Sequence, residues 1–176
     1  MTTKTLPRVT EILKSAGLID ARFFTPQAAE FGTNVHLLCK YYDENRLNMT
    51  DVERLGAQGH LDAWASFRSW AFDFGHEDFG GIEQTLRSER YGFQGTPDRV
   101  WYFRSADYIL DIKTGTPQKW HAIQLAGYQI LVGKKCHRMG VYLSGDGRYT
   151  AKLYDDDGDR DVFLAALAIS NWKEGL

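Results

Sequence analysis

Hydrophobic residues recur at the three- and four-residue spacing of an α-helix through the first half of the chain and again near its end. Thr25 followed by Pro26 is typical of a helix N-cap and its first turn. Gly17 and Gly75 are typical of helix ends. The pattern predicts helices over residues 7–18, 25–45, 50–74, 117–132 and 159–173. In the last of these, the predicted buried face consists of Val162, Ala165, Ala166, Ile169 and Trp172.

Runs of β-branched and aromatic residues between turn-forming residues predict the strands. They lie at residues 82–90, 96–103, 108–113, 138–143 and 149–154. Short turns at 91–95 and 104–107 join the first three, which predicts an antiparallel meander. The order of elements is typical of an α/β or α+β fold, with a mixed central sheet of about five strands flanked by helices. No repeat or linker interrupts the chain, so we expect one domain over residues 1–176, with a helical N-terminal half.

The composition is that of an ordinary globular chain. Of the 176 residues, 43% are hydrophobic and 14% are aromatic. A chain of this length can bury a core without disulfides or structural metals. The net charge of −2 does not by itself predict a nucleic-acid partner. The basic stretch at 134–138 is, taken alone, better explained as a solvated helix end.

The cysteines and the chain start bear on the cellular compartment. Only Cys39 and Cys136 occur, with no CxxC pair, which argues against a structural zinc site or an iron–sulfur cluster and suits a reducing environment. The first residues lack a signal-peptide pattern, and the longest uninterrupted apolar run, 162–169, is too short to span a membrane. We therefore expect a cytoplasmic protein without a membrane partner, located in the host cytoplasm if the chain is phage-encoded.

Asp98, Asp111 and Lys113 are the residues that most strongly indicate chemistry. Side chains alternate between the faces of a strand, so Asp111 and Lys113 project to one side. Asp98 lies on the neighbouring predicted strand, where the register can bring its carboxylate beside that of Asp111. Two close carboxylates repel each other and are normally retained for a shared proton or a hard cation, and a lysine beside them favours phosphate or hydroxide chemistry with Mg²⁺ or Mn²⁺. From spacing alone, polar positions on the exposed face of a sheet are an equally good interpretation.

A wider set of residues surrounds this triplet in an order that resembles a known family. The motifs are Gly95-x-x-Asp98, Asp111-x-Lys113-Thr114-Gly115, Gln124-x-x-x-Tyr128 and, upstream, Gly32-x-x-x-His36. Glu83 on the first predicted strand matches an expected glutamate. The chain thus resembles the RecB-like exonuclease branch of the PD-(D/E)xK nuclease superfamily. Its ends, LPRVTEIL and SNWK, resemble those of compact phage-encoded members without an iron–sulfur cluster.

The resemblance implies a restriction-endonuclease-like core and a role for each motif residue. His36, Asp98, Asp111 and the main-chain carbonyl of Ile112 would bind Mg²⁺ or Mn²⁺, and Lys113 would be the catalytic lysine. Without the resemblance, a lone helical histidine such as His36 is better explained as a core residue. Glu83 either contributes to catalysis at the metal or its bound water, or pairs with Arg87 or Arg90 at the sheet surface.

Candidate contacts with DNA lie on the helix at 117–132. Gln124 and Tyr128 are one turn apart on one face, where they either position the DNA or pack the helix on the sheet. Trp120 and Tyr128 are candidates for stacking on unpaired bases, which would favour single-stranded or frayed ends. His121 has no counterpart in the signature, but it lies one turn before Gln124, where it can face the substrate.

The resemblance implies a metal-dependent DNA exonuclease that leaves 5′-phosphate products in phage-type recombination or repair. The expected partners are DNA and a recombination or single-strand-binding protein. Two alternatives stay open. One is a structure- or sequence-specific endonuclease on the same core, and the other is a non-catalytic DNA-binding or assembly protein.

Overall fold

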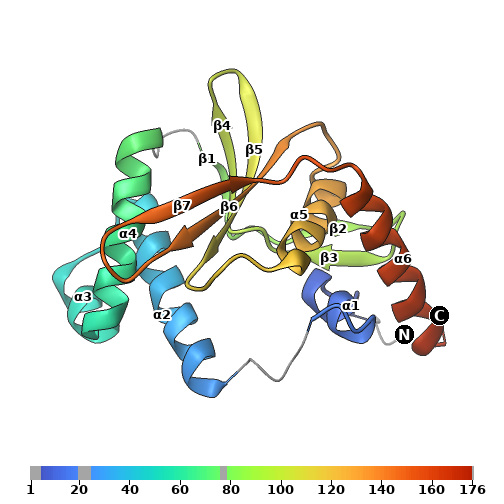
Figure 1. Cartoon of the computed structure of the whole chain (residues 1–176), viewed down its shortest axis with the longest axis horizontal. Coiled ribbons are helices and arrows are strands. Elements are labelled where there is room, and N and C mark those ends of the chain that lie inside the picture. The colour runs from blue at the N-terminus through green and yellow to red at the C-terminus, as the bar shows by residue number, and fades with distance from the viewer. Residues whose placement is uncertain (1–4, 20–24, 76–78, 176) are drawn as a thin grey trace.

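Six helices and seven strands are formed by the residues that the computed structural model describes, which are 5–19, 25–75 and 79–175 (Figure 1). The helices are α1 Val9–Ser15, α2 Pro26–Asp43, α3 Met49–Leu55, α4 Gln58–Phe74, α5 Lys119–Val132 and α6 Gly158–Lys173. The strands are β1 Phe79–Ile82, β2 Leu86–Ser88, β3 Phe93–Gly95, β4 Arg99–Phe103, β5 Ala106–Lys113, β6 His137–Leu143 and β7 Tyr149–Leu153. In this part of the chain, no helix has the length and apolar character of a membrane span.

A mixed five-stranded sheet forms the centre of the fold, in the order β1-β4-β5-β6-β7. The β5–β6 pair is parallel and is connected by α5, whereas the other neighbours are antiparallel. Strands β2 and β3 form a separate hairpin. The predicted α/β fold, a mixed sheet of five strands flanked by helices, is confirmed.

Alternating residues of β5 pack into two separate cores, one on each face of the sheet. Ile109 belongs to a core shared with α1, α5 and α6. Leu110 and Ile112 belong to a core shared with α2 and α4, and that core contains Phe67, Trp70 and Trp101. Figure 1 shows α2 and α4 on one side of the sheet and α1, α5 and α6 on the other. Residues 111 and 113 therefore face the α5 side by strand alternation.

Two helix predictions need correction. The expected helix at 50–74 is divided into α3 and α4, because Gly56 leaves helical geometry with ψ at 53°. Helix α6 is rotated relative to the expectation: Phe163, Ala166, Leu167 and Ser170 are buried. Of the predicted buried face, Val162, Ala165, Ile169 and Trp172 are exposed and Ala166 is buried. The rotation is set by Phe163, whose ring packs so closely on Gly127 of α5 that a Cβ there would lie 2.6 Å from it.

The strand prediction for 82–90 is also wrong. This segment contributes to two different sheets, with β1 ending at Ile82 and β2 beginning at Leu86. Glu83 breaks the strand with a left-handed φ of 47°. The predicted turn at 91–95 falls instead at 89–92, and residues 93–95 form β3. Only β4 and β5 form the expected hairpin, through Arg104 and Ser105, whose positive φ values suit a tight two-residue turn.

A buried ion pair joins the end of α2 to the start of β4. Arg99 Nε donates to Asp43 Oδ2 at 2.6 Å, and neither side chain is exposed to solvent. Arg99 Nη1 also donates to the main-chain carbonyl of Asp98 at 2.6 Å. Burying two charges is costly, so breaking such a pair by removing one partner is strongly destabilising. The pair therefore fixes the backbone at Asp98 relative to α2.

We expect Asp43→Asn to lower the free energy of unfolding by about 3–5 kcal/mol, because it leaves the Arg99 charge buried without its counter-ion. Urea unfolding followed by tryptophan fluorescence measures this change. Arg148→Met is the matched control, since Arg148 pairs with Asp146 at the surface and its side chain is 85% exposed. The control should leave the unfolding midpoint almost unchanged. An equal effect of the two substitutions would contradict the role of the buried pair.

Candidate active site

Asp98 and Asp111 are brought side by side by the pairing of β4 with β5. Arg99 pairs with Leu110, so Asp98, one residue earlier, lies opposite Asp111. Asp98 Oδ2 accepts a hydrogen bond of 2.6 Å from the backbone N–H of Ile112. The two aspartates are only 9% and 3% exposed. The alternative interpretation, in which they are polar positions on an exposed sheet face, is therefore wrong.

Lys113 lies next to Asp111 on the same face of β5. Its Nζ is 2.5 Å from Asp111 Oδ2, and its side chain also lines a cleft above the sheet. Burial raises the pKa of the Asp111 carboxyl; the charge of Lys113 opposes this only in part, and the charge of Asp98 adds to it. The ionised form of Asp111 is thus held in the fold at a free-energy cost, which a bound cation would relieve.

His36 of α2 meets the other carboxylate. Its Nδ1 is 3.3 Å from Asp98 Oδ1. Burial opposes protonation of His36, but the charge of Asp98 and a hydrogen bond to it prevail, so the pKa of His36 lies above its ordinary value. Burial alone would raise the pKa of Asp98, yet the charge of His36 and its hydrogen bond prevail and lower that pKa to about 2. The sequence-predicted residues His36, Asp98, Asp111 and Lys113 therefore form one contiguous cluster.

Glu83 lies at the edge of this cluster in the strand break between β1 and β2. Its Oε2 accepts a hydrogen bond of 2.9 Å from Nζ of Lys40, and not from Arg87 or Arg90 as one interpretation proposed. Its backbone N–H donates to the carbonyl of Asp98 at 2.9 Å. Non-glycine residues such as Glu83 rarely adopt the left-handed conformation, and the backbone strain that it causes is often found at functional sites. Lys40 was not predicted from the sequence as part of the site, although it lies one helical turn after His36.

Gln124 and Tyr128 are both buried, at 4% and 5% exposure. Gln124 Nε2 donates to Tyr128 Oη at 3.0 Å, and Tyr128 belongs to the core under α5. Tyr128 packs against Gly95: a Cβ at that glycine would lie 2.8 Å from the tyrosine ring. The structure therefore uses the Gln124–Tyr128 pair to seat α5 on the strand that leads to Asp98. A direct contact of either residue with DNA stays a prediction.

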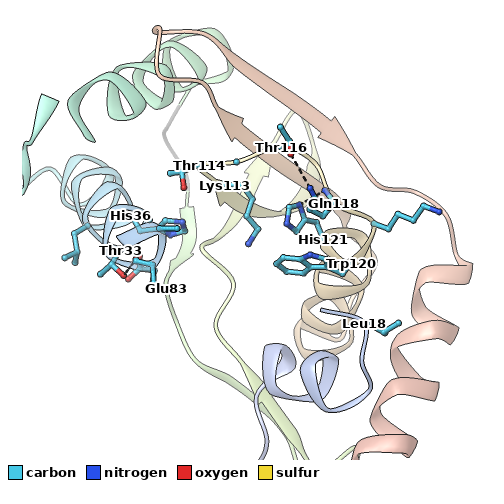
Figure 2. Close-up of a pocket in the computed structure, with 16 residues that line it drawn as sticks. Leu18, Thr33, His36, Glu83, Lys113, Thr114, Thr116, Gln118, Trp120 and His121 are labelled. Carbon is cyan, nitrogen blue, oxygen red and sulfur yellow. Dashed lines mark hydrogen bonds between the residues drawn. The ribbon is translucent and has the colours of Figure 1, made fainter. Parts of the chain in front are cut away.

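A cleft of about 1130 Å³ opens above Lys113. One wall comes from α2 and includes Gly32, Thr33 and His36, and the other comes from the start of α5. The floor between them is the segment from Lys113 to Thr116. Figure 2 shows His36 on the α2 side of this space, Lys113 reaching into it from the floor, and Trp120 and His121 beyond the lysine on the α5 side. The two aspartates lie beneath the cleft, since they are buried and do not line it.

Two of the three lysines and arginines in the basic stretch at 134–138 are held in ion pairs. Lys134 pairs with Asp107, and Arg138 is buried in an ion pair with Asp159. The lysines that line the cleft are Lys113 and Lys119. Among the described residues, the lysine charge available to a polyanion at the cleft therefore comes from these two side chains, and the basic stretch is not part of the lining.

The oxygen donors of the cluster suit a hard cation. Asp98 and Asp111 supply two adjacent carboxylates, of the kind that bind Mg²⁺ or Mn²⁺. Over the described residues, no group of three or more His, Cys, Asp or Glu side chains is already arranged around a single point. Instead, the Asp98 carboxylate contacts His36 and the N–H of Ile112, and the Asp111 carboxylate contacts Lys113. The cations around the carboxylates thus balance the charge that a metal ion would otherwise balance.

The fold is shared with a solved structure, a candidate exonuclease from Eubacterium rectale. The two superpose with a TM-score of 0.62 at 15% sequence identity, over 98% of this chain and 82% of the other. An alkaline exonuclease from Laribacter hongkongensis overlaps with a TM-score of 0.43 at 16% identity, over 96% of this chain and 91% of the other. No family model and no curated protein matches the sequence. The similarity to the first protein shows that this chain has the same α/β fold, in agreement with the predicted fold class.

Proposed function

We propose that the protein is a metal-dependent DNA nuclease that hydrolyses phosphodiester bonds at Asp98, Asp111 and Lys113. The observation that carries the proposal is the pair of buried carboxylates on adjacent strands, with an ammonium group 2.5 Å from one of them at the base of an open cleft. Burying such a pair costs free energy, so its presence beneath a cleft supports a catalytic role over a structural one. The fold shared with a candidate exonuclease adds support.

Mg²⁺ or Mn²⁺ is the proposed cofactor, held by Asp98, Asp111 and the carbonyl of Ile112, with His36 as the nitrogen ligand. When bound, the metal supplies Lewis-acid chemistry and lowers the pKa of water. Lys113 is proposed to stabilise negative charge on the scissile phosphate, because its ammonium group lies between Asp111 and the cleft. Glu83 and Lys40 hold the rim of the site through their ion pair. No iron–sulfur cluster is proposed, since both cysteines are buried and lie outside the site.

Cleavage from a DNA end is the specific form of the proposal, with 5′-phosphate products. The similar protein of known structure is a candidate exonuclease, which supports this choice over an endonuclease. A role in phage-type recombination or repair, with a recombination or single-strand-binding partner, rests on the sequence resemblance.

We expect the purified protein to digest end-labelled oligonucleotides with Mg²⁺ or Mn²⁺ and to be inactive in EDTA. Asp111→Asn and Lys113→Met should each reduce the rate by at least about a hundredfold, as loss of one charge-stabilising group does. Asp107→Asn and Lys134→Met are matched controls, because this ion pair involves the same strand but lies outside the cleft. Metal-dependent cleavage at the wild-type rate by Asp111→Asn would refute the proposal.

The end requirement has its own test. We expect linear DNA to be degraded and covalently closed circular DNA to stay intact under the same conditions. Gel electrophoresis of the two substrates distinguishes these results. Nicking or linearisation of the circle at a comparable rate would favour an endonuclease instead.

Thermal unfolding tests metal binding independently of activity. In EDTA at neutral pH, Asp111→Asn should raise Tm, because the raised pKa of Asp111 means that its ionised form destabilises the fold. The gain should vanish below the unfolded pKa of about 4, where Asp111 is protonated in both states.

Mn²⁺ should raise the Tm of the wild type and not that of the variant. Equal Mn²⁺ shifts for the two proteins would place the metal elsewhere.

A further inference from the structure

The start of α5 forms a wall of the cleft that the proposed hydrolysis does not use. Trp120 and His121 both line this wall, and their rings meet edge to face with centroids 4.1 Å apart. Lys113 Nζ lies 5.5 Å from the centre of the Trp120 ring. A flat aromatic surface thus stands directly beside the proposed catalytic lysine (Figure 2).

His121 is fixed in one orientation by contacts to its Nδ1. The backbone N–H of Gln118 donates to Nδ1 at 3.2 Å, which makes His121 the acceptor of a capping box at the start of α5. The hydroxyl of Tyr142 lies 2.8 Å from the same nitrogen and is itself 2.5 Å from that of Tyr154. Because Nδ1 accepts a hydrogen bond, the proton of the neutral ring is assigned to Nε2.

Nε2 of His121 is left as a hydrogen-bond donor at the cleft. The side chain is only 3% exposed but belongs to the cleft lining, and no residue in the described ranges supplies an acceptor for Nε2. Burial, together with the charge of Lys113, lowers the pKa of His121 to about 3. The ring is therefore neutral at neutral pH and keeps a single N–H.

Apolar side chains also line the cleft. Leu18 lies on the same side as Trp120, and Ala28, Ala29 and Leu37 lie on the α2 wall, next to Thr33 and His36. Apolar and aromatic groups supply no counter-charge for phosphates, which are left to Lys113 and Lys119 of the lining. A lining of this kind next to one N–H suits a flat heterocycle with a ring or carbonyl acceptor, which is the chemistry of a nucleobase.

We propose that Trp120 and His121 form a binding site for an unpaired nucleobase, with the base stacked on the indole and accepting a hydrogen bond from His121 Nε2. The identity of the ligand as DNA rests on the proposed function. In a duplex, both faces of a base are covered by its neighbours and its pairing edge is occupied. The subsite thus selects single-stranded or frayed DNA and sets the base beside Lys113.

The test is a double-mutant comparison of affinity in EDTA, where no cleavage is expected. A fluorescent single-stranded oligothymidylate is compared with matched probes that carry abasic residues at one end, one probe for each end. Trp120→Ala should weaken binding of the intact probe roughly five- to a hundredfold, the effect of losing one stacked base. One of the two abasic probes lacks the base that would stack on the indole. Trp120→Ala should weaken the binding of that probe little further. Trp120→Phe should retain most of the affinity.

Trp172→Ala is the matched control, because it removes an indole that is 79% exposed on α6, outside the cleft lining. It should leave binding unchanged. If Trp120→Ala and Trp172→Ala have equal effects, or if Trp120→Ala weakens the intact and abasic probes equally, the base-stacking site is refuted.

His121 needs variants that separate binding from helix capping. His121→Gln keeps an N3 cap and a side-chain N–H, whereas His121→Leu removes both. The leucine variant should weaken binding of the intact probe roughly two- to tenfold, the effect of one hydrogen bond, and glutamine should restore part of it. A lower Tm with unchanged affinity of the folded leucine variant would show a structural role only and refute the donor assignment.

The two proposals fail separately. Coupling between Trp120 and the base without any metal-dependent cleavage would refute the nuclease and leave the base site standing. Cleavage that is lost in Asp111→Asn, without that coupling, would refute the base site and leave the nuclease standing.

Discussion

The buried ion pair between Arg99 and Asp43 holds the candidate active site to its scaffold. Arg99 anchors the first residue of β4 to the end of α2 and at the same time donates to the carbonyl of Asp98. Helix α2 in turn carries His36, which contacts the Asp98 carboxylate. Arg99 therefore links the backbone of Asp98 to α2, the helix that carries His36. A charge so deep in the fold tolerates little displacement, and this rigidity fixes the position of Asp98.

Positive and negative side chains offset one another in the cluster, but the pKa values of its two carboxyls are shifted in opposite directions. Asp98 is held in its ionised form by His36 and by the N–H of Ile112, whereas Asp111 is ionised against the preference of its surroundings. Neighbouring carboxylates with opposite pKa shifts are typical of catalytic sites, because each group then serves a different role. The cleft lining is also divided, with His36 on the α2 side of Lys113 and the aromatic ring of Trp120 on the α5 side.

Strand alternation and motif order were sufficient to predict a mixed sheet of five strands, the adjacency of Asp98 with Asp111, and the place of Lys113, but not the division of residues 82–90 between two sheets. Features that depend on packing between distant segments were not predictable. The rotation of α6 follows from the fit of Phe163 on Gly127, and the apolar pattern of α6 alone admits either face. The burial of Gln124 and Tyr128 follows from the contact of Tyr128 with Gly95. The partner of Glu83 was missed because Lys40 comes from a helix whose position relative to the strand break has no local signal.

Much of the frame around Asp98 is made by main-chain groups. Its carboxylate accepts from the N–H of Ile112, and its carbonyl accepts from the N–H of Glu83 as well as from Arg99. Almost every amino acid supplies the same backbone N–H and C=O, so substitution at positions such as 112 can leave these bonds intact. Natural selection need preserve only a few side chains to preserve this geometry. During divergence, sequence similarity around such a site is therefore expected to decay long before its three-dimensional arrangement does.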